Sequence, residues 1–455
     1  MQLKKIAVMI FLVQGSLTSN AQICFSDSVS YNTGNGSMGI TSGDFNGDLK
    51  TDIVSANLSD NTISILLGDG AGSFSNATSY AVGSSPRILI NADFNKDNKL
   101  DIASANSGSG NISVLLGDGA GAFAAAVNFT VGMSPYSLTS ADVNGDNKLD
   151  IISANYNANN VSVLLGDGAG SFSAATNFSV GTNPHSVAAA DINGDNKIDI
   201  VTANWGSDNG SILLGNGDGT FANFTVQTLG FIADPVCLIL DDISGDGKID
   251  IACAHNGSHN VTLLKGDGAG GFGAALSKGV GSRPFSLTVA DFDGDGKKDL
   301  ATANYFANNV SVLIADGSGG FNAAQNYPVG KSTRSITAAD FDTDGNMDIA
   351  VVNFGTNNAS VLMNCTVTTA LLEKNLSHEF SVYPLPAQEF VLINSNDISI
   401  NQYSVYNVLG ELMFEESNLN NHQIRLERNN LSNGIYYVNC LSNGKLVSTQ
   451  KMIFE

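Results

Sequence analysis

Seven short segments of this 455-residue chain place acidic and amide side chains at a fixed spacing. The segments follow the pattern Asp-x-Asn-Gly-Asp-x-Lys-x-Asp with local variations, and they begin at Asp44, Asp93, Asp142, Asp191, Asp242, Asp291 and Asp340. Positions 1, 3, 5 and 9 of each segment supply side-chain oxygens, and position 7 supplies a backbone carbonyl. Alternating oxygens on a tight turn suit a hard cation that takes about six to eight oxygen ligands. The segments therefore predict calcium sites, about one for each segment.

Four side-chain ligands are expected in every segment. They are Asp44, Asn46, Asp48 and Asp52; Asp93, Asn95, Asp97 and Asp101; Asp142, Asn144, Asp146 and Asp150; Asp191, Asn193, Asp195 and Asp199; Asp242, Ser244, Asp246 and Asp250; Asp291, Asp293, Asp295 and Asp299; and Asp340, Asp342, Asp344 and Asp348. Since a fully ligated loop leaves no open coordination position, we expect structural rather than catalytic ions. Position 6 should adopt a positive φ, which Asn and Gly tolerate, so Leu49 at this position predicts a weaker first site. Ser244 offers a hydroxyl, a poorer ligand, and therefore predicts a weaker fifth site. The alternative is an Asx-rich turn that needs no metal, although its crowded carboxylates would repel one another.

The charge of the whole chain is strongly negative. It carries 43 Asp and Glu against 21 Lys and Arg, a formal net charge of −22. Because phosphates would be repelled, neither nucleic acid nor an anionic membrane surface is expected as a partner. The acidic segments hold 23 of the 43 acidic residues, so the acidity mostly reflects the expected metal ligation.

The acidic segments are parts of a longer repeat. They recur at steps of 49 residues, with one step of 51 between Asp191 and Asp242. Four short apolar runs accompany each segment, for example residues 137–141, 150–154, 161–165 and 172–180 in the third repeat. Four runs of strand length with no helical period predict one propeller blade. The expected fold class is therefore all-β, with a seven-bladed β-propeller over residues 22–365.

The two ends of the repeat region complement each other. The seventh repeat stops after Cys365 without its fourth run, whereas Phe25 and Tyr31 stand 49 residues before Phe74 and Tyr80 in matching context. The N-terminal segment is therefore expected to supply the outer strand of the seventh blade and to close the ring.

The cysteines fit the same closure. In the repeat register, Cys24 and Cys365 flank the place where a complete blade has the turn between its third and fourth strands. A disulfide there would replace the missing turn at the short Cα separation that such bonds require; the alternative is a pair of buried thiols. Cys237 and Cys253 flank the fifth acidic segment and are candidates for a second bridge, which would leave Cys440 unpaired.

The segments outside the repeats predict export and a second domain. Residues 1–21 have the pattern of a secretory signal peptide, with Lys4 and Lys5 before an apolar run. The rest of the sequence has no run of about 18 apolar residues, so no membrane-spanning helix is expected. Residues 366–378 are expected to form a linker. Over residues 379–455 alternating apolar residues between Asn and Gly turns predict a small β-sandwich.

Two resemblances follow from these motifs. The repeat over residues 24–365 resembles the FG-GAP/VCBS family, as in integrin α-subunits, through the acidic segments and a Gly-Asp-Gly-Ala-Gly-x-Phe turn such as residues 68–74. The tail resembles the C-terminal sorting domain of the type IX secretion system of Bacteroidetes, although Leu385 stands where that family usually has Asn. Its matching motifs are Tyr383-Pro-Leu-Pro-Ala387, Gly434-Ile-Tyr-Tyr-Val438 and Lys451-Met-Ile-Phe454. This resemblance implies the secretion machinery as a partner, passage through the outer membrane, and then release or surface attachment.

A binding surface is indicated by the positions that differ between otherwise similar repeats. In a four-stranded blade, the loops after the second and fourth strands lie at the end opposite the acidic loops; we call these two ends the variable face and the acidic face. The blade-to-blade positions are Met38, Arg87, Tyr136, His185, Val236, Phe285 and Arg334, and those after the second strand are Leu58, Ser107, Tyr156, Trp205, Asn256, Tyr305 and Phe354. A carbohydrate or protein surface stacks on aromatic rings and hydrogen-bonds to nearby Asn and Arg. The candidate ligand-binding residues are therefore Arg87, Tyr136, His185, Phe285, Arg334, Tyr156, Trp205, Tyr305 and Phe354; the alternative is that these side chains only cover the channel mouth and the blade ends.

The expected function is recognition. None of the five His residues stands in a nucleophile elbow or a His-Glu-x-x-His helix. We therefore expect a secreted or cell-surface, calcium-stabilised monomer that binds an extracellular glycan or protein. Two alternatives stay open, an extracellular enzyme acting on polysaccharide or phosphoester and a purely structural surface component.

Overall fold

The computed structural model describes residues 23–230, 234–366, 380–395, 399–407, 412–428, 431–442 and 445–455. The predicted signal peptide and all of the predicted linker except Thr366 lie outside the described residues. The chain divides into two compact units, residues 1–368 and 369–455. Within the described residues both units consist of strands and irregular segments, and no helix is long and apolar enough to cross a membrane.

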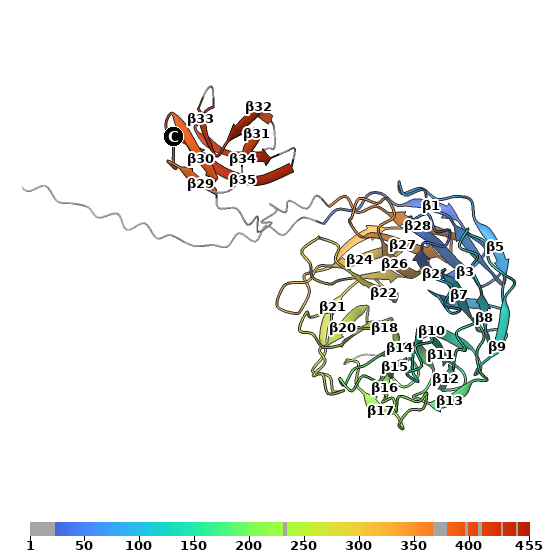
Figure 1. Cartoon of the computed structure of the whole chain (residues 1–455). Coiled ribbons are helices and arrows are strands. Elements are labelled where there is room, and N and C mark those ends of the chain that lie inside the picture. The colour runs from blue at the N-terminus through green and yellow to red at the C-terminus, as the bar shows by residue number, and fades with distance from the viewer. Residues whose placement is uncertain are drawn as a thin grey trace, which may run out of the picture. The chain divides into compact units, whose positions relative to one another are not determined.

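The first unit is a ring of seven four-stranded antiparallel sheets, the blades of the propeller (Figure 1). Blades 1 to 3 contain β2 (Ser37–Gly43), β3 (Asp52–Asn57), β4 (Thr62–Leu66) and β5 (Thr78–Ala81); β6 (Pro86–Ala92), β7 (Asp101–Asn106), β8 (Asn111–Leu115) and β9 (Val127–Thr130); and β10 (Pro135–Ala141), β11 (Asp150–Asn155), β12 (Asn160–Leu164) and β13 (Thr176–Ser179). Blades 4 to 6 contain β14 (Pro184–Ala190), β15 (Asp199–Asn204), β16 (Asn209–Leu213) and β17 (Thr225–Gln227); β18 (Pro235–Asp241), β19 (Asp250–His255), β20 (Asn260–Leu264) and β21 (Leu276–Gly279); and β22 (Pro284–Ala290), β23 (Asp299–Asn304), β24 (Asn309–Leu313) and β25 (Gln325–Pro328). The predicted seven-bladed propeller is confirmed.

The seventh blade joins the two ends of the ring. It contains β26 (Thr333–Ala339), β27 (Asp348–Asn353), β28 (Asn358–Leu362) and, as its outer strand, β1 (Val29–Asn32). Tyr31 pairs with Ala359 in this sheet, so closure by an N-terminal strand is also confirmed. Cys24 and Cys365 form a disulfide with a Cα separation of 5.0 Å.

The second strand of each blade is buried on both sides because a neighbouring blade covers each side. In β3, Ile53 packs in a cluster with blade 7, whereas the next residue, Val54, packs in a cluster with blade 2. Successive strand side chains point to opposite faces of a sheet. A sheet covered on both faces needs apolar residues at consecutive positions, which explains why these strands lack the apolar–polar alternation.

A buried polar residue ends the second strand at the variable face. In six blades it is Asn; Asn155 is fully buried, and its Nδ2 donates to Asn160 Oδ1 and Ser162 Oγ, each at 2.8 Å. In blade 5 His255 takes this place and contacts Thr262 Oγ1 at 2.8 Å. These bonds satisfy the buried polar groups and fix the ends of the strands that carry the variable face.

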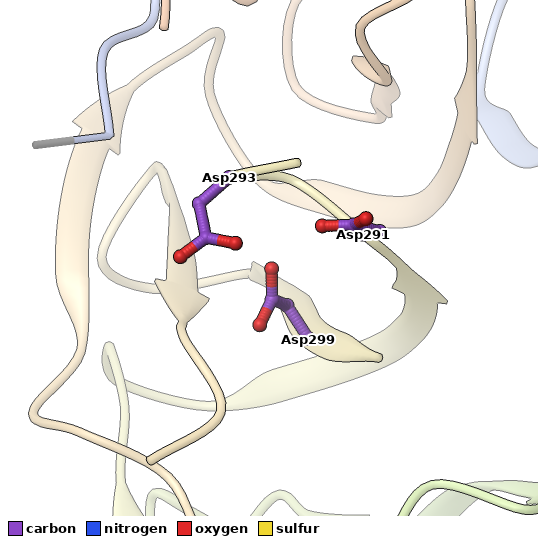
Figure 2. A group of neighbouring side chains, drawn as sticks. All are labelled: Asp291, Asp293 and Asp299. Carbon is purple, nitrogen blue, oxygen red and sulfur yellow. The ribbon is translucent and has the colours of Figure 1, made fainter. Parts of the chain in front are cut away.

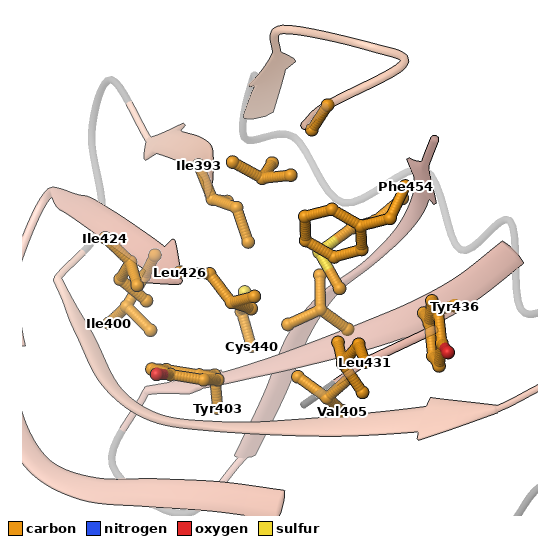
Figure 3. Close-up of a cluster of buried hydrophobic side chains, with 14 of the residues drawn as sticks. Ile393, Ile400, Tyr403, Val405, Ile424, Leu426, Leu431, Tyr436, Cys440 and Phe454 are labelled. Atoms are coloured by element: carbon orange, nitrogen blue, oxygen red, sulfur yellow. The ribbon is translucent and has the colours of Figure 1, made fainter. Parts of the chain in front are cut away.

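The second unit contains two sheets around one core (Figure 3). One sheet contains β29 (Phe380–Tyr383), β30 (Phe390–Ser395) and β33 (Gln423–Glu427). The other contains β31 (Ile400–Asn407), β32 (Leu412–Asn421), β34 (Gly434–Ser442) and β35 (Lys445–Phe454). Ile393 of the first sheet and Val405 and Val438 of the second are fully buried in the shared core, as expected for the predicted sandwich.

The second disulfide considered from the sequence is not formed. Cys237, Cys253 and Cys440 are free thiols. In the pairing of β18 with β19, Cys237 lies opposite Ala254 and Cys253 lies opposite Leu238, and the two cysteines belong to different core clusters. Their side chains therefore leave opposite faces of the sheet, which the sequence spacing did not reveal.

Candidate functional site

The backbone folds the acidic loops in the same way in all seven blades. In the first loop, the carboxylate of Asp44 accepts hydrogen bonds from the amides of Gly47 at 2.7 Å and Leu49 at 2.8 Å. Position 6 has a positive φ in every loop, at Leu49, Asn98, Asn147, Asn196, Gly247, Gly296 and Gly345. Leu49 adopts this conformation too, with φ of 65° and a side chain that is 90% exposed. The first loop thus shares the backbone conformation of the others, and its weaker affinity for calcium stays a prediction.

The aspartate at position 9 is fully buried in every loop. The two carboxylate oxygens of Asp52 accept hydrogen bonds from the amides of Gly68 at 2.7 Å and Phe45 at 2.9 Å. Burial raises the pKa of Asp52 to about 6, and the charges of Asp48 and Asp44 act in the same direction. Burial likewise raises the pKa of Asp299 to about 7 and that of Asp348 to about 6. A cation beside these carboxylates would offset the cost of burying their charge.

In the sixth and seventh loops, three of the four predicted ligand positions come together. Oxygens of Asp291, Asp293 and Asp299 all lie within 4.8 Å of one another, as do those of Asp340, Asp342 and Asp348; Figure 2 shows the first group. Carboxylate oxygens at this spacing are a donor set that a hard divalent cation uses. At position 5 Asp295 instead forms a salt bridge with the side chain of Lys297. In the fifth loop the hydroxyl of Ser244 at position 3 is buried without a hydrogen-bond partner.

The acidic loops also connect neighbouring blades. The carbonyl of Phe45 in the first loop accepts a hydrogen bond from the amide of Gly121 in blade 2 at 3.1 Å. The ring of Phe45 packs against Phe123, the last residue of the same glycine-rich turn, at a centroid distance of 5.8 Å. The first acidic loop is therefore part of the contact between blades 1 and 2.

Blade 5 interrupts this pattern. The side chain of Leu67, Leu116, Leu165 or Leu214 reaches the glycine-rich turn of the next blade, but Lys265 takes this place in blade 5. A cavity of about 430 Å³ lies next to it, lined by residues that include Asp242, Lys298 and Phe321. Replacing a packed leucine by a charged side chain leaves this part of the acidic face less tightly packed.

A backbone hydrogen bond common to all blades builds the variable face. The residue after the second strand donates a hydrogen bond from its backbone amide to the carbonyl of the residue two positions before the blade-to-blade position. For example, the amide of Tyr156 donates to the carbonyl of Ser134 at 2.9 Å, and that of Tyr305 to the carbonyl of Arg283 at 2.8 Å. Equivalent bonds are present at Leu58, Ser107, Trp205, Asn256 and Phe354. The bond does not depend on the side chain, so these positions can vary while the loop stays in place.

The blade-to-blade residues meet around the central axis. Met38, Arg87, Tyr136, His185, Val236, Phe285 and Arg334, with the next residues of several strands, line a cavity of about 80 Å³ that we call the central cavity. No Asp or Glu is among its lining residues. The structure thus brings one predicted position from every blade to a single place.

The predicted aromatic residues form two groups beside the central cavity. In the first group, Tyr136 stacks on Tyr156 at 4.3 Å with an interplanar angle of 14°, and Tyr156 lies 6.1 Å from Trp205. In the second group, Phe285 lies 5.4 Å from Tyr305, and the guanidinium of Arg334 lies over the rings of Phe285, Tyr305 and Phe354 at 4.0, 4.3 and 5.6 Å. Arg87 lies 3.8 Å over Tyr136.

Two further residues extend the second group and escaped the sequence comparison. Phe306 is 56% exposed and packs edge-on against Tyr305 at 5.4 Å, and Arg283 lies 4.5 Å over its ring. Phe306 follows Tyr305 directly in the chain, so a comparison of the next loop position would have found it.

His185 joins the two groups. Its Nδ1 donates a hydrogen bond to the carbonyl of Val236 at 2.6 Å, and its ring lies 5.4 Å from Tyr136 and 6.3 Å from Phe285. Burial lowers the pKa of His185 to about 4, and the charges of Arg87 and Arg334 act in the same direction. The imidazole is therefore neutral near neutral pH.

Comparisons with known proteins identify both parts of the chain. An FG-GAP-like repeat model matches residues 44–91, 93–153, 142–202, 193–253, 242–302 and 291–351, and the model of the secretion system C-terminal sorting domain matches residues 381–455. The protein is a repeat propeller with a sorting domain. Since the repeat matches cover more than half of the chain, it belongs to the FG-GAP-like repeat family. Both predicted resemblances are confirmed.

The sorting domain indicates secretion to the cell surface or extracellular space and interaction with the type IX secretion machinery. The predicted localisation is thereby confirmed. No curated protein sequence matches the chain.

Solved structures share the propeller fold. A streptogramin B lyase structure has a TM-score of 0.54 at 16% identity, covering 76% of this chain and 100% of that one. A structure of BBS1N in complex with ARL6DN has a TM-score of 0.53 at 14% identity, with coverages of 76% and 100%. An inactive virginiamycin B lyase from Staphylococcus aureus with quinupristin has a TM-score of 0.52 at 16% identity, with coverages of 75% and 99%. At these identities the likeness concerns the fold alone.

Proposed function

We propose that this chain is a secreted or surface-displayed propeller that binds an extracellular glycan or protein through its variable face. The main support is the pair of aromatic groups beside the central cavity, because flat rings next to arginines suit both sugar stacking and protein contact. The equivalent positions in blades 1 and 5 are Met38 with Leu58 and Val236 with Asn256. The aromatic residues are thus confined to blades 3, 4, 6 and 7, as expected for a surface shaped to one ligand.

The proposal includes calcium in about seven structural sites on the acidic face. The convergent carboxylates, the buried position-9 aspartates and the unpartnered hydroxyl of Ser244 support it. Positions 1, 3 and 9 would hold the ion. Where position 5 pairs with a lysine, as at Asp295, it would join after leaving that lysine, since an exposed ion pair of this kind stabilises by only about 0–1 kcal/mol. Bound calcium would neutralise the loops that join neighbouring blades.

The proposed domain limits follow the sequence pattern. Residues 1–21 would be the signal peptide, 22–365 the binding propeller, 366–378 the linker and 379–455 the sorting domain. We propose that the mature propeller acts as a monomer.

Replacing Tyr156, Trp205 and Tyr305 together by Ala tests the choice of face. We expect ligand binding, found by a glycan-array and extracellular-protein screen of the calcium-loaded chain, to weaken by more than about tenfold. Thermal stability should change little because these rings lie at loop ends rather than in the blade cores.

Leu49→Ala is the matched control, since Leu49 is 90% exposed on the acidic face. It should leave binding unchanged. If binding survives the triple substitution and is lost in the Leu49 variant, the ligand binds the acidic face instead.

A further inference from the structure

We propose that the central cavity binds an anionic group, the carboxylate or sulfate of an acidic glycan, between the guanidinium groups of Arg87 and Arg334. This inference rests on the proposed function and specifies the chemistry of its ligand. The two arginines come from blades 2 and 7, on either side of blade 1, where the uncharged Met38 completes the lining.

Both arginines lack an anionic partner. Within the described residues neither forms a salt bridge, and the lining of the central cavity includes no carboxylate. Arg87 donates from Nε to Ser107 Oγ at 3.1 Å, whereas the Nε of Arg334 is buried without a hydrogen-bond partner. Both arginines are half-buried, and taking a cationic group partly out of water without an opposite charge beside it costs free energy. An anion in the central cavity would supply the missing partner.

The surroundings of the two guanidiniums favour an anion further. Burial lowers the pKa of Arg334, and the nearby charge of Arg87 also lowers it. An anion between them would offset this repulsion. The aromatic rings cover the flat faces of the guanidiniums, 3.8 Å away at Tyr136 and 4.0 Å away at Phe285. Stacking on a face leaves the N–H groups at the edge available for the two-pronged bond that Arg makes to carboxylate or sulfate oxygens.

The size of the site and its borders favour a glycan. One water needs about 10–15 Å³ of such space, so the central cavity of about 80 Å³ takes a charged substituent with a few waters rather than a polymer chain. The rest of the ligand would lie on the aromatic groups, which lead from the cavity to Trp205, 38% exposed, and Phe306, 56% exposed. Sugar rings stack on such faces, while their acidic substituents reach the arginines.

The negative net charge of the chain does not oppose this ligand locally. All three arginines of residues 22–365, Arg87, Arg283 and Arg334, belong to the variable face. The first strand of blade 2 has seven residues, so the acidic loop at its other end lies about 20 Å from Arg87. This distance is more than twice the Debye length of about 8 Å, so salt screens the charge of the acidic loops. The loops of the variable face also contain Asp60, Asp208 and Asp234, but none of these three residues lines the central cavity.

The test uses the full calcium-loaded chain and its single tryptophan, Trp205, as a fluorescent reporter. The probes are trigalacturonate, sulfated maltotriose, neutral maltotriose and a hexaglutamate peptide, with calorimetry for ligands that leave the fluorescence unchanged. We expect at least one acidic trisaccharide to bind tenfold or more tightly than maltotriose. The double variant Arg87→Gln, Arg334→Gln should remove this preference. Lys331→Gln, which removes an exposed positive charge of the same face outside the cavity, should alter affinity by less than twofold.

Each outcome distinguishes the inference from the proposed function. Preference for trigalacturonate or for the sulfated sugar identifies the anionic group. Equal binding of neutral and acidic sugars that depends on Trp205 would overturn the anion site while leaving the proposed function intact, and binding of hexaglutamate alone would replace the glycan by an acidic peptide. Failure of all four probes would overturn the inference, whereas the screen with the triple aromatic variant judges the proposed function separately. If the double glutamine variant melts early, Arg87→Lys with Arg334→Lys keeps both charges and should weaken acidic-sugar binding by removing the two-pronged bond.

Discussion

The acidic face and the variable face lie at opposite ends of the same seven blades, yet they use repetition differently. On the acidic face an aspartate stands at positions 1, 5 and 9 of every loop. On the variable face the blade-to-blade position changes from Met38 to Arg87 to Tyr136 in successive blades. A residue that is repeated in every blade indicates a structural role in the blade itself. A residue that differs from blade to blade indicates a role at one place on the assembled surface.

The hydrogen bonds explain why each face behaves in this way. On the acidic face side chains hold the loop, because the carboxylates of Asp44 and Asp52 accept the backbone amides that shape it. On the variable face backbone groups hold the residues that vary, as between Tyr156 and Ser134, while repeated side chains such as Asn155 fix the strand ends. A substitution on the acidic face should therefore change stability, and one on the variable face should change binding. The predictions below test this contrast.

Removal of calcium should have the largest effect on stability. At free calcium about a hundredfold above the dissociation constant, each occupied loop adds about 2.7 kcal/mol to the free energy of unfolding. With about seven loops, excess chelator should lower the melting temperature by more than about 10 °C in calorimetry. Asp142→Ala, which impairs one loop, should show a fraction of this shift. An unchanged melt in chelator would mean that the acidic loops fold without metal.

Loss of the ring-closing disulfide should come next. It joins residues separated by 341 positions, and for a loop of this length the chain-entropy model gives a contribution of about 6 kcal/mol. We expect Cys24→Ser with Cys365→Ser to lower the free energy of unfolding by an amount of this order, measured by denaturant titration in calcium. The reductant-treated wild type should resemble the double variant. Equal stabilities would show that β1 closes the ring without covalent help.

The sequence predicted the fold well because each blade repeats the same information. The register of 49 residues predicted the positions of the acidic loops, the closing strand and the disulfide partners Cys24 and Cys365. Whether Cys237 and Cys253 form a disulfide could not be predicted in this way, because their spacing does not show from which face of the sheet each side chain projects. The conformation of Leu49 could not be predicted from its residue type either. The surrounding hydrogen bonds impose a positive φ that leucine disfavours.

The chemistry of the variable face was predictable only in part. Residue types indicated the aromatic and arginine positions but not their pairing. The stacking of Tyr136 on Tyr156 and of Arg334 on Phe285 depends on which blades are neighbours and on how far each side chain reaches. The unpaired guanidiniums could not be inferred, because the absence of a carboxylate from the central cavity is a property of the assembled ring.

The smallest predicted effect is the contribution of His185, on the variable face, to the pH dependence of the free energy of unfolding. Its pKa falls from 6.5 to about 4 on folding, so between these values the unfolded chain binds a proton that the folded chain does not. Stability is therefore unaffected by His185 above pH 6.5 and declines as the pH falls toward 4. Allowing for the partial exposure of the ring, we expect a loss of about 1–2 kcal/mol at pH 5.

The variant His185→Gln isolates this contribution because its acidic face is identical to that of the wild type. Between pH 7 and pH 5, denaturant titration in calcium should show a smaller loss of stability for the variant, by the same amount of about 1–2 kcal/mol. The exposed His422→Gln in the second unit serves as control. Loss of calcium on acidification weakens both proteins equally and cancels in the difference. An identical pH dependence would mean that His185 takes up its proton in the folded protein, and that Arg87 and Arg334 do not act on it as their positions indicate.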